Sequence, residues 1–397
     1  MLFSTGASVV AIVTVAGIVV VRGPSPGDGA LDAAAGRDAA EMVELQFSPA
    51  DSAVDVPLDS SITVHITAGH LDLVTATGAL GAPVEGTTDA DGTTWRFDGP
   101  LAPGTTYSVI ADGTTPAGEP IHGAATFTTV TPSDVLTPRI TPSDGLIVGV
   151  GQPIVVRFDS PVTDQQAMLR RLTVTMSAPV PGAWHWFTET EVHFRPKDYW
   201  PAGEHVTVTV DLAGYDNGDG VWGDGVHTSE FTVGDSHIST VDLEAHTMTV
   251  TDNGQVERTM PVSAGRDKYP TMTGTHIALY RQRDVLMDSS TVGIPRNSPD
   301  GYYEHVYWDV AITDGGEFVH AAPWSASAQG NRNVSHGCVN LSEADAEWFF
   351  NFSRMGDVID VVNGPRPPEL ADHGVMDWNT PWEVWLAGAS PDRPSVR

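Results

Sequence analysis

Short runs in which apolar and polar residues alternate dominate residues 43–233. Residues 61–67, 154–158 and 205–210 are examples, and each run is bounded by Gly, Pro, Asp or Ser. Alternation with period two is typical of strands that bury one face, and the bounding residues favour turns. We therefore predict that this stretch is built from β-strands.

The same stretch repeats itself. Phe47-Ser-Pro49 opens a first unit and Ile140-Thr-Pro142 a second, and residues 94–97 of the first match residues 191–194 of the second. A repeat of about 95 residues made of short strands is typical of an immunoglobulin-like sandwich. We expect one such domain over 43–132 and another over 133–235, serving as a stalk or as a wall-binding module.

The N-terminus has a different pattern. Residues 1–21 carry no charged side chain, and as a helix they would span roughly 31 Å, close to the thickness of a bilayer core. We expect residues 1–22 to enter the membrane as a retained anchor or a cleaved signal, with residues 23–42 as a linker. Arg22 and Arg37 follow the span, whereas an outward-facing body favours positive charge before it.

The net charge of the chain excludes some classes of binding partner. The chain has 397 residues, of which 51 are acidic and 20 basic, giving a formal net charge of −31. Such a balance excludes most nucleic-acid binders and argues against electrostatic docking on anionic lipid. The sequence has no Gly-rich phosphate loop after a strand and no Cys-His haem pattern, so we expect no required cofactor.

An acidic loop interrupts the second unit. Asp216, Asp219 and Gly220 lie in a run of carboxylates and glycines over residues 211–225. Carboxylate and backbone oxygens of this kind can surround calcium, although the run is not an EF-hand. Two interpretations are open, an acidic hairpin loop and a weak structural Ca²⁺ site.

Cys338 is the only cysteine in the sequence, so it is either an inert apolar residue or a reactive thiol. His336 lies two residues before it, His320 eighteen before it, and Gly337 directly before it. A thiol, a nearby base and free amides for an oxyanion are what nucleophilic cysteine chemistry requires. A zinc site fails on ligand number, because two His and one Cys match no usual pattern.

A helix is predicted directly after the cysteine. Ser342 and Asp345 form a capping-box pattern before residues 343–350, and Gly356 is expected to end the helix. We expect the positive N-terminal end of this helix to favour the Cys338 thiolate.

These residues resemble a known motif. A histidine, then Ser-His-Gly-Cys and an asparagine two residues on are similar to the signature of the L,D-transpeptidases with a YkuD catalytic domain; here they are His320, 335–338 and Asn340. The likeness covers residues 237–390, and the upstream units resemble the paired immunoglobulin-like domains of mycobacterial and other actinobacterial members. It implies a mainly β catalytic sandwich over 236–363, with a short helix after the cysteine, and a Trp-rich extension over 364–397.

The resemblance also implies a reaction. Cys338 would attack the third residue of a peptidoglycan stem tetrapeptide and expel D-alanine, and the thioester would pass to the amine of a second stem to give a 3→3 cross-link. His320 would be the general base, oriented by the main-chain carbonyl of Ala321. Carbapenem-type inhibitors, donor and acceptor stem peptides and the membrane are the implied partners, with the protein outside the cytoplasm of a bacterium.

Further roles follow from the same resemblance. His336 would shape the loop, and the Tyr302 hydroxyl would join the amides of Gly337 and Cys338 around the oxyanion. Substrate would be held or enclosed by Asn340, Gly315, Gly316, Met287, Trp324 and Ser335. Core packing is an equally good interpretation of Met287 and Trp324, and Tyr303 competes with Tyr302 for the inward position.

Three functional interpretations are open. The first is the transpeptidase, the second an L,D-carboxypeptidase in which water resolves the same acyl-enzyme, and the third a wall-binding protein without catalysis. Intact His320, His336 and Cys338 speak against the third. The cluster of Trp378, Trp382 and Trp385 is expected to clamp the catalytic sheet.

Overall fold

The computed structural model describes residues 17–18, 42–369 and 376–388. The chain divides into two compact units, Met1–Leu136 with Leu212–Gly225, and Thr137–Asp211 with Val226–Arg397. Of the predicted membrane segment, only Gly17–Ile18 lies among the described residues. In the described part of the chain, no helix combines the length and apolar character needed to cross a membrane.

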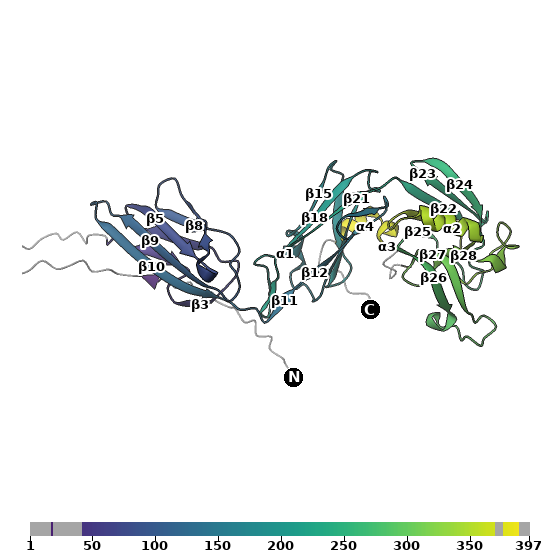
Figure 1. Ribbon diagram of the computed structural model, residues 1–397, viewed down its shortest axis with the longest axis horizontal. Helices are drawn as coiled ribbons and strands as arrows, with labels where there is room; N and C mark the ends of the chain where they lie inside the picture. Colours follow the sequence, from purple (N-terminus) through teal and green to yellow (C-terminus); the bar gives the residue numbers. More distant parts are fainter. Residues whose placement is uncertain (1–16, 19–41, 370–375, 389–397) are drawn as a thin grey trace, which may run out of the picture. The chain divides into compact units, whose positions relative to one another are not determined.

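The first unit contains a β-sandwich (Figure 1). One sheet has the order β1 (Gly17–Ile18), β2 (Leu45–Ser48), β4 (Ile62–Ile66), β8 (Thr94–Phe97), β7 (Thr87–Thr88). The other has the order β3 (Ala53–Val56), β10 (Pro120–Thr129), β9 (Thr106–Thr114), β5 (His70–Thr77), β6 (Pro83–Val84). A short 3₁₀ helix, η1, covers Ala79–Gly81. Ile62, Val64 and Ile66 of β4 are buried between the sheets, as period-two alternation requires.

The second unit begins with another sandwich. Its sheets have the orders β12 (Pro138–Thr141), β14 (Ile154–Phe158), β17 (Glu191–Pro196), β16 (Gly182–Trp186) and β13 (Leu146–Val148), β21 (Val226–Val233), β18 (His205–Asp211), β15 (Leu172–Met176). Helix α1 (Gln165–Leu169) connects β14 to β15. The sequence matches 94–97 and 191–194 fall on β8 and β17, which confirms that both are strands.

The remainder of the second unit is a further pair of sheets with helix α2 (Glu343–Phe352) packed on strands β27 and β28. The sheets have the orders β24 (Gln255–Pro261), β23 (Thr247–Asp252), β22 (His237–Asp242), β30 (Val358–Val362), β25 (Gly274–Ile277) and β26 (Tyr280–Asp288), β27 (Tyr303–Ala311), β28 (Phe318–Ala321), β29 (Val339–Leu341). Two 3₁₀ turns, η2 (Ser289–Val292) and η3 (Pro323–Ser325), flank the second sheet's strands in sequence. The mainly β catalytic sandwich expected for this part is confirmed.

Helix α2 begins as predicted and continues two residues beyond the predicted range 343–350, ending before Gly356. The Ser342 side chain accepts a hydrogen bond from the Asp345 backbone N–H at 3.1 Å, which is the expected N-cap. The helix stops at Phe352, with Ser353 extended as its C-cap. Gly356 was expected to end the helix; it instead adopts a φ of 87° in the following turn.

The C-terminal extension forms two short helices, α3 (Met376–Asn379) and α4 (Trp382–Ala387). The indole N–H of Trp378 donates to the Gly151 carbonyl at 2.7 Å, and that of Trp385 to Ala183 at 2.9 Å. The guanidinium of Arg195 lies over both rings and over Trp382, at 4.7–5.2 Å. The tryptophans therefore clamp the β16–β17 side of the second sandwich, not the catalytic sheet as the sequence led us to expect.

A buried charge network accompanies these tryptophans. His193 lies between the carboxylates of Asp377, at 2.9 Å, and Glu191, at 2.7 Å. Burial alone would lower the pKa of His193, but the two carboxylates outweigh it and raise that pKa to about 9. On the other side of the extension, the Asn379 amide donates to the Thr275 carbonyl of β25 at 2.8 Å.

The acidic loop forms a small sheet with strand order β11 (Asp134–Leu136), β20 (Val221–Gly223), β19 (Asp216–Gly218) in the first unit. The Asp216 carboxylate accepts the Gly218 N–H, and the Gly220 carbonyl accepts from both the N–H and the hydroxyl of Ser133. Asp219 adopts a φ of 52° at the turn. The Asp216 carboxylate and the Gly220 carbonyl thus stabilise the turn, and the calcium site stays a prediction.

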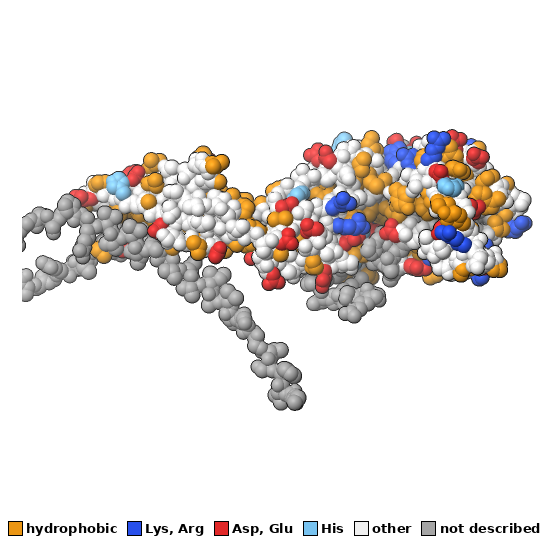
Figure 2. All heavy atoms as spheres, turned by 60° about the horizontal axis from the view of Figure 1, so that its bottom comes forward, with side chains coloured by type: hydrophobic (Ala, Val, Ile, Leu, Met, Phe, Trp, Pro, Cys, Tyr) orange, Lys and Arg blue, Asp and Glu red, His pale blue; other side chains and the backbone are white. Residues whose placement is uncertain are grey.

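Acidic side chains are scattered over one face of the molecule. Figure 2 shows aspartate and glutamate side chains at separate places on this face, with lysine and arginine in a few small groups. On this face the acidic residues therefore do not form a single binding patch.

Candidate active site

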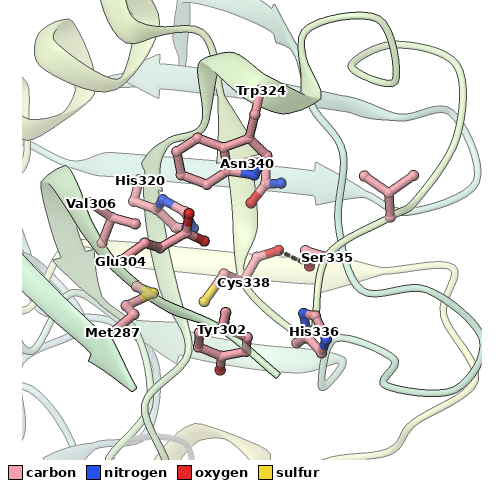
Figure 3. A pocket seen from close by; sticks show the side chains of 11 residues that line it. Met287, Tyr302, Glu304, Val306, His320, Trp324, Ser335, His336, Cys338 and Asn340 are labelled. Carbon is pink, nitrogen blue, oxygen red and sulfur yellow. Dashed lines mark hydrogen bonds between the residues drawn. The ribbon is translucent and has the colours of Figure 1, made fainter. Parts of the chain in front are cut away.

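Eight of the predicted catalytic and substrate-binding residues line one pocket with a volume of about 160 Å³, whereas Gly315, Gly316 and Gly337 do not line it. Figure 3 shows their side chains gathered around Cys338. The walls consist of Met287, Tyr302, Glu304, Val306, His320, Trp324, Val334, Ser335, His336, Cys338 and Asn340. Residues of the sequence motif therefore lie together in the walls of a single pocket.

Two parallel strands bring the motif together. In the β28–β29 pair His320 lies opposite Asn340, and Cys338 directly precedes β29. The Asn340 amide donates to the Ser325 hydroxyl at 3.1 Å, which fixes the side chain at the pocket wall. His320 and Cys338 are eighteen positions apart in sequence. They come close together because the parallel pairing of β28 with β29 places them in adjacent register.

His320 is held in one tautomer. Its Nδ1–H donates to the Ala321 carbonyl at 2.9 Å, as the resemblance implied, and Nε2 remains as the acceptor available to the pocket. The side chain is 3% exposed. Burial lowers the pKa of His320 to about 4, even though the hydrogen bond to Ala321 acts in the opposite direction. At neutral pH the imidazole is therefore neutral and able to accept a proton.

The thiol is neutral as well. Burial raises the pKa of Cys338 to about 12, and the carboxylates of Glu317 and Asp309 add to the rise. The sulfur contacts the Gly316 carbonyl at 3.9 Å, the geometry of a weak S–H donor. The pocket therefore contains a neutral thiol and imidazole rather than a preformed ion pair.

The expected effect of the α2 dipole on this thiol stays a prediction. Strand β29 lies between Cys338 and the helix in sequence, and the field of a helix terminus falls off within its first turn. Burial is the main influence on the pKa of Cys338, and it raises that pKa.

Hydrogen bonds fix the backbone before the cysteine. The Ser335 hydroxyl donates to the Cys338 carbonyl at 2.6 Å and accepts the Gly337 N–H at 3.1 Å. Thr271 donates to the Gly337 carbonyl at 2.6 Å, and Gly337 adopts a φ of 135°, which favours glycine. In this conformation the Gly337 amide is engaged with Ser335, so its predicted role toward an oxyanion stays a prediction.

His336 supports the loop, as expected. Its Nε2 accepts a hydrogen bond from Arg266 at 2.8 Å, and its ring lies between those of Tyr269 and Tyr302. Burial lowers the pKa of His336, and the adjacent guanidinium lowers it further. Arg266 also pairs with Asp300 at 2.6 Å, so His336 links the nucleophile loop to the segment before β27.

The structure resolves the choices that the sequence left open. Tyr302 lines the pocket, whereas Tyr303 is exposed and stacks with Arg296. Trp324 is 56% exposed, so it forms a pocket wall rather than core, and Met287 lines the opposite side. Gly316 contacts the sulfur through its carbonyl, and Gly315 lies beside it in the β27–β28 turn without lining the pocket.

Sequence reasoning missed Glu304 and Val306. Both line the pocket from β27, at alternate positions after Tyr302. Counting every second residue onward from Tyr302, which directly precedes β27, would have found them.

A second missed group lies beneath the nucleophile loop. Glu317 is 9% exposed, and its Oε1 lies 3.0 Å from the place where a Cβ on Gly337 would stand. Arg366, from the segment after β30, pairs with Glu317 at 2.5 Å and with the exposed Glu369 at 2.6 Å. Since Glu317 raises the pKa of Cys338 in addition to burial, Arg366 offsets an unfavourable charge next to the nucleophile.

We expect Arg366→Gln to slow covalent modification of Cys338 about tenfold, because a nearly buried carboxylate is left without its cation. The double variant Glu317→Gln/Arg366→Gln should recover most of the rate. Glu369→Gln, which removes only the exposed partner, serves as the control. Stopped-flow measurements compare the rate of Cys338 modification among these proteins, and melting temperatures show whether each variant is folded. A double variant that reacts more slowly than Arg366→Gln would contradict this role of the ion pair.

Comparisons with known proteins agree with this geometry. Residues 53–216 match a bacterial Ig domain, and residues 236–361 match the L,D-transpeptidase catalytic domain. The chain is 39% identical over 373 residues to L,D-transpeptidase 2 of Mycobacterium tuberculosis (strain CDC 1551 / Oshkosh), covering 92% of this chain and 90% of that protein. It is 33% identical to L,D-transpeptidase 5 of M. tuberculosis (strain ATCC 25618 / H37Rv), covering 89% and 78%. The solved structure of LD transpeptidase LdtMt1 in complex with imipenem matches with a TM-score of 0.51 and 39% identity, covering 58% of this chain and 100% of that one.

Proposed function

The chain belongs to the L,D-transpeptidase family, and we propose that it forms 3→3 cross-links between peptidoglycan stem peptides through a Cys338 thioester. The observation that carries the proposal is the fixed tautomer of His320, whose Nε2 is left to accept a proton in the pocket that contains the Cys338 thiol. The similarity to L,D-transpeptidases of M. tuberculosis and the match over the catalytic domain support the reaction class.

In the proposed first half-reaction His320 Nε2 takes the thiol proton as the sulfur attacks the carbonyl of the third stem residue. The neutral pair suits a concerted transfer, because neither group has to carry charge before the substrate arrives. The Cys338 amide and the Tyr302 hydroxyl are the proposed oxyanion donors. The imidazolium then gives its proton to the departing amine of D-alanine.

In the second half-reaction the amine of another stem's third residue attacks the thioester, and an amide replaces the C–S bond. If water attacks instead, the product is a tripeptide and the enzyme acts as an L,D-carboxypeptidase. Met287 and Trp324 line the pocket as proposed contacts for the stem peptides.

Incubation with a disaccharide-tetrapeptide tests the proposal. We expect mass spectrometry to detect a dimer one D-alanine lighter than two substrates, together with free D-alanine. Tripeptide without dimer would favour the carboxypeptidase, and neither product would contradict both. Since LdtMt1 was solved with imipenem, we also expect a carbapenem to add its mass to the chain at Cys338.

A further inference from the structure

Glu304 lies on the inward face of β27. Tyr302, Glu304 and Val306 occur at alternate positions and all line the pocket. Val306 is buried, whereas Glu304 is exposed like its neighbours Tyr303 and His305, so its carboxylate is accessible to solvent as well as to the pocket. In the β26–β27 ladder Glu304 pairs with Met287, another pocket residue. Figure 3 shows the Glu304 carboxylate on the same side of the pocket as His320 and extending inward.

Glu304 carries a negative charge that no cationic residue in the pocket lining neutralises. Among the eleven lining residues no other is an aspartate, glutamate, lysine or arginine, and burial lowers the pKa of both His320 and His336. Within the described residues, no side chain hydrogen bonds or ion-pairs with Glu304, and burial raises its pKa. A carboxylate that is left unpaired beside a nucleophile is complementary to a cationic ligand.

The two substrates of the proposed reaction differ in charge at the atom that enters the pocket. The donor presents a neutral amide carbonyl, whereas the acceptor presents an amine that is protonated at neutral pH. We propose that Glu304 is the acceptor-binding residue, which holds the ammonium group of the incoming stem peptide and takes its first proton. The inference rests on the proposed function, because it assigns a residue to the second half-reaction.

The proton balance requires such a group. The incoming ammonium loses one proton to become a nucleophilic amine, and Glu304 takes that proton as a carboxylic acid. The nitrogen loses a second proton as the amide bond forms and the C–S bond breaks, and His320 Nε2 passes it to the sulfur to restore the thiol. Glu304 then releases its proton to water. A water molecule that resolves the thioester arrives uncharged and does not need Glu304.

We expect Glu304→Gln to affect the two half-reactions differently. A carbapenem whose only charge is its carboxylate is repelled by Glu304, so Glu304→Gln should acylate at the wild-type rate or faster. The same variant should form dimer about tenfold more slowly relative to tripeptide, because the charge-assisted contact with the acceptor is lost. A substitution that merely damaged the pocket would slow both reactions.

The experiment measures the dimer-to-tripeptide ratio from the disaccharide-tetrapeptide for the wild type, Glu304→Gln, Glu304→Asp and Glu257→Gln. Glu257 is an exposed glutamate of β24 outside the pocket, so its variant controls for the loss of one charge. We expect the control to match the wild type and Glu304→Asp to give an intermediate ratio. The deficit of Glu304→Gln should shrink as the pH approaches the pKa of the acceptor amine.

The outcomes separate the two proposals. An unchanged ratio in Glu304→Gln, with normal carbapenem acylation, overturns the role of Glu304 and leaves the transpeptidase intact. A wild type that forms no acyl-enzyme, dimer or tripeptide overturns the proposed function itself. If Glu304→Gln fails to acylate, the dimer-to-tripeptide ratio of Glu304→Asp is the test of the inference. A Glu304→Asp ratio equal to that of the wild type at every pH overturns the role of Glu304.

Discussion

The Cys338→Ala variant is expected to form neither a carbapenem adduct nor any dimer, tripeptide or free D-alanine. The reason is chemical, because no other cysteine exists in the sequence and no other nucleophile can form the thioester. Turnover should fall below about 10⁻⁴ of the wild-type rate. Intact-protein mass spectrometry and muropeptide analysis measure the two losses.

The same variant should fold normally. Cys338 is half-buried, and its sulfur makes a weak contact at 3.9 Å with Gly316, so its loss should change the free energy of unfolding by no more than about 1 kcal/mol. Cys338→Ser provides the matched control, since it retains a smaller nucleophile in the same place. Adduct formation by a well-folded Cys338→Ala protein would show that the acylated residue is another one.

The His320→Gln variant is expected to lose about 10²–10⁴ in acylation rate, because glutamine cannot take the thiol proton. The wild-type pH profile adds a second test. Since burial lowers the pKa of His320 to about 4 and raises that of Cys338 to about 12, the neutral pair persists between these values. The rate should fall only as the pH drops through about 4, where Nε2 becomes protonated.

His336→Gln is the comparison for this variant, because His336 accepts from Arg266 and is not the proposed base. We expect it to lose much less activity than His320→Gln. A wild-type profile with its acid limb near pH 6 or 7, with circular dichroism showing folded protein throughout, would instead indicate a histidine of ordinary pKa or a preformed ion pair.

The chemistry of the site could be predicted from the sequence better than its electrostatics. The spacing of His320, Cys338 and Asn340 in the motif predicts that they lie together. The motif also predicts the hydrogen bond of His320 to Ala321, because that contact uses the main-chain carbonyl. The sequence places Cys338 just before α2, but it does not show that residues 339–341 between them form a strand. The raised thiol pKa also depends on burial and on Glu317, which only packing reveals.

Long-range partners account for the other gaps. The tryptophans of the extension are evident in the sequence, but nothing local indicates that they contact Gly151, Ala183 and Arg195. Strand periodicity similarly predicts that Tyr302 and Tyr303 face opposite ways, and only the pocket shows which of them faces inward. Glu304 lies on the same face as Tyr302, so it could be identified as a pocket residue only once Tyr302 was known to face inward.

The C-terminal extension has a consequence for how the protein can be divided. Asp377 and Trp385 contact the second sandwich, while Asn379 contacts β25 of the catalytic part. A recombinant fragment cut at residue 361, where the match to the catalytic domain ends, would leave His193 without Asp377 and uncover an aromatic surface. The smallest fragment suited to screening inhibitors therefore starts before β12 and retains residues up to 388, with the sandwich and the catalytic sheets melting together.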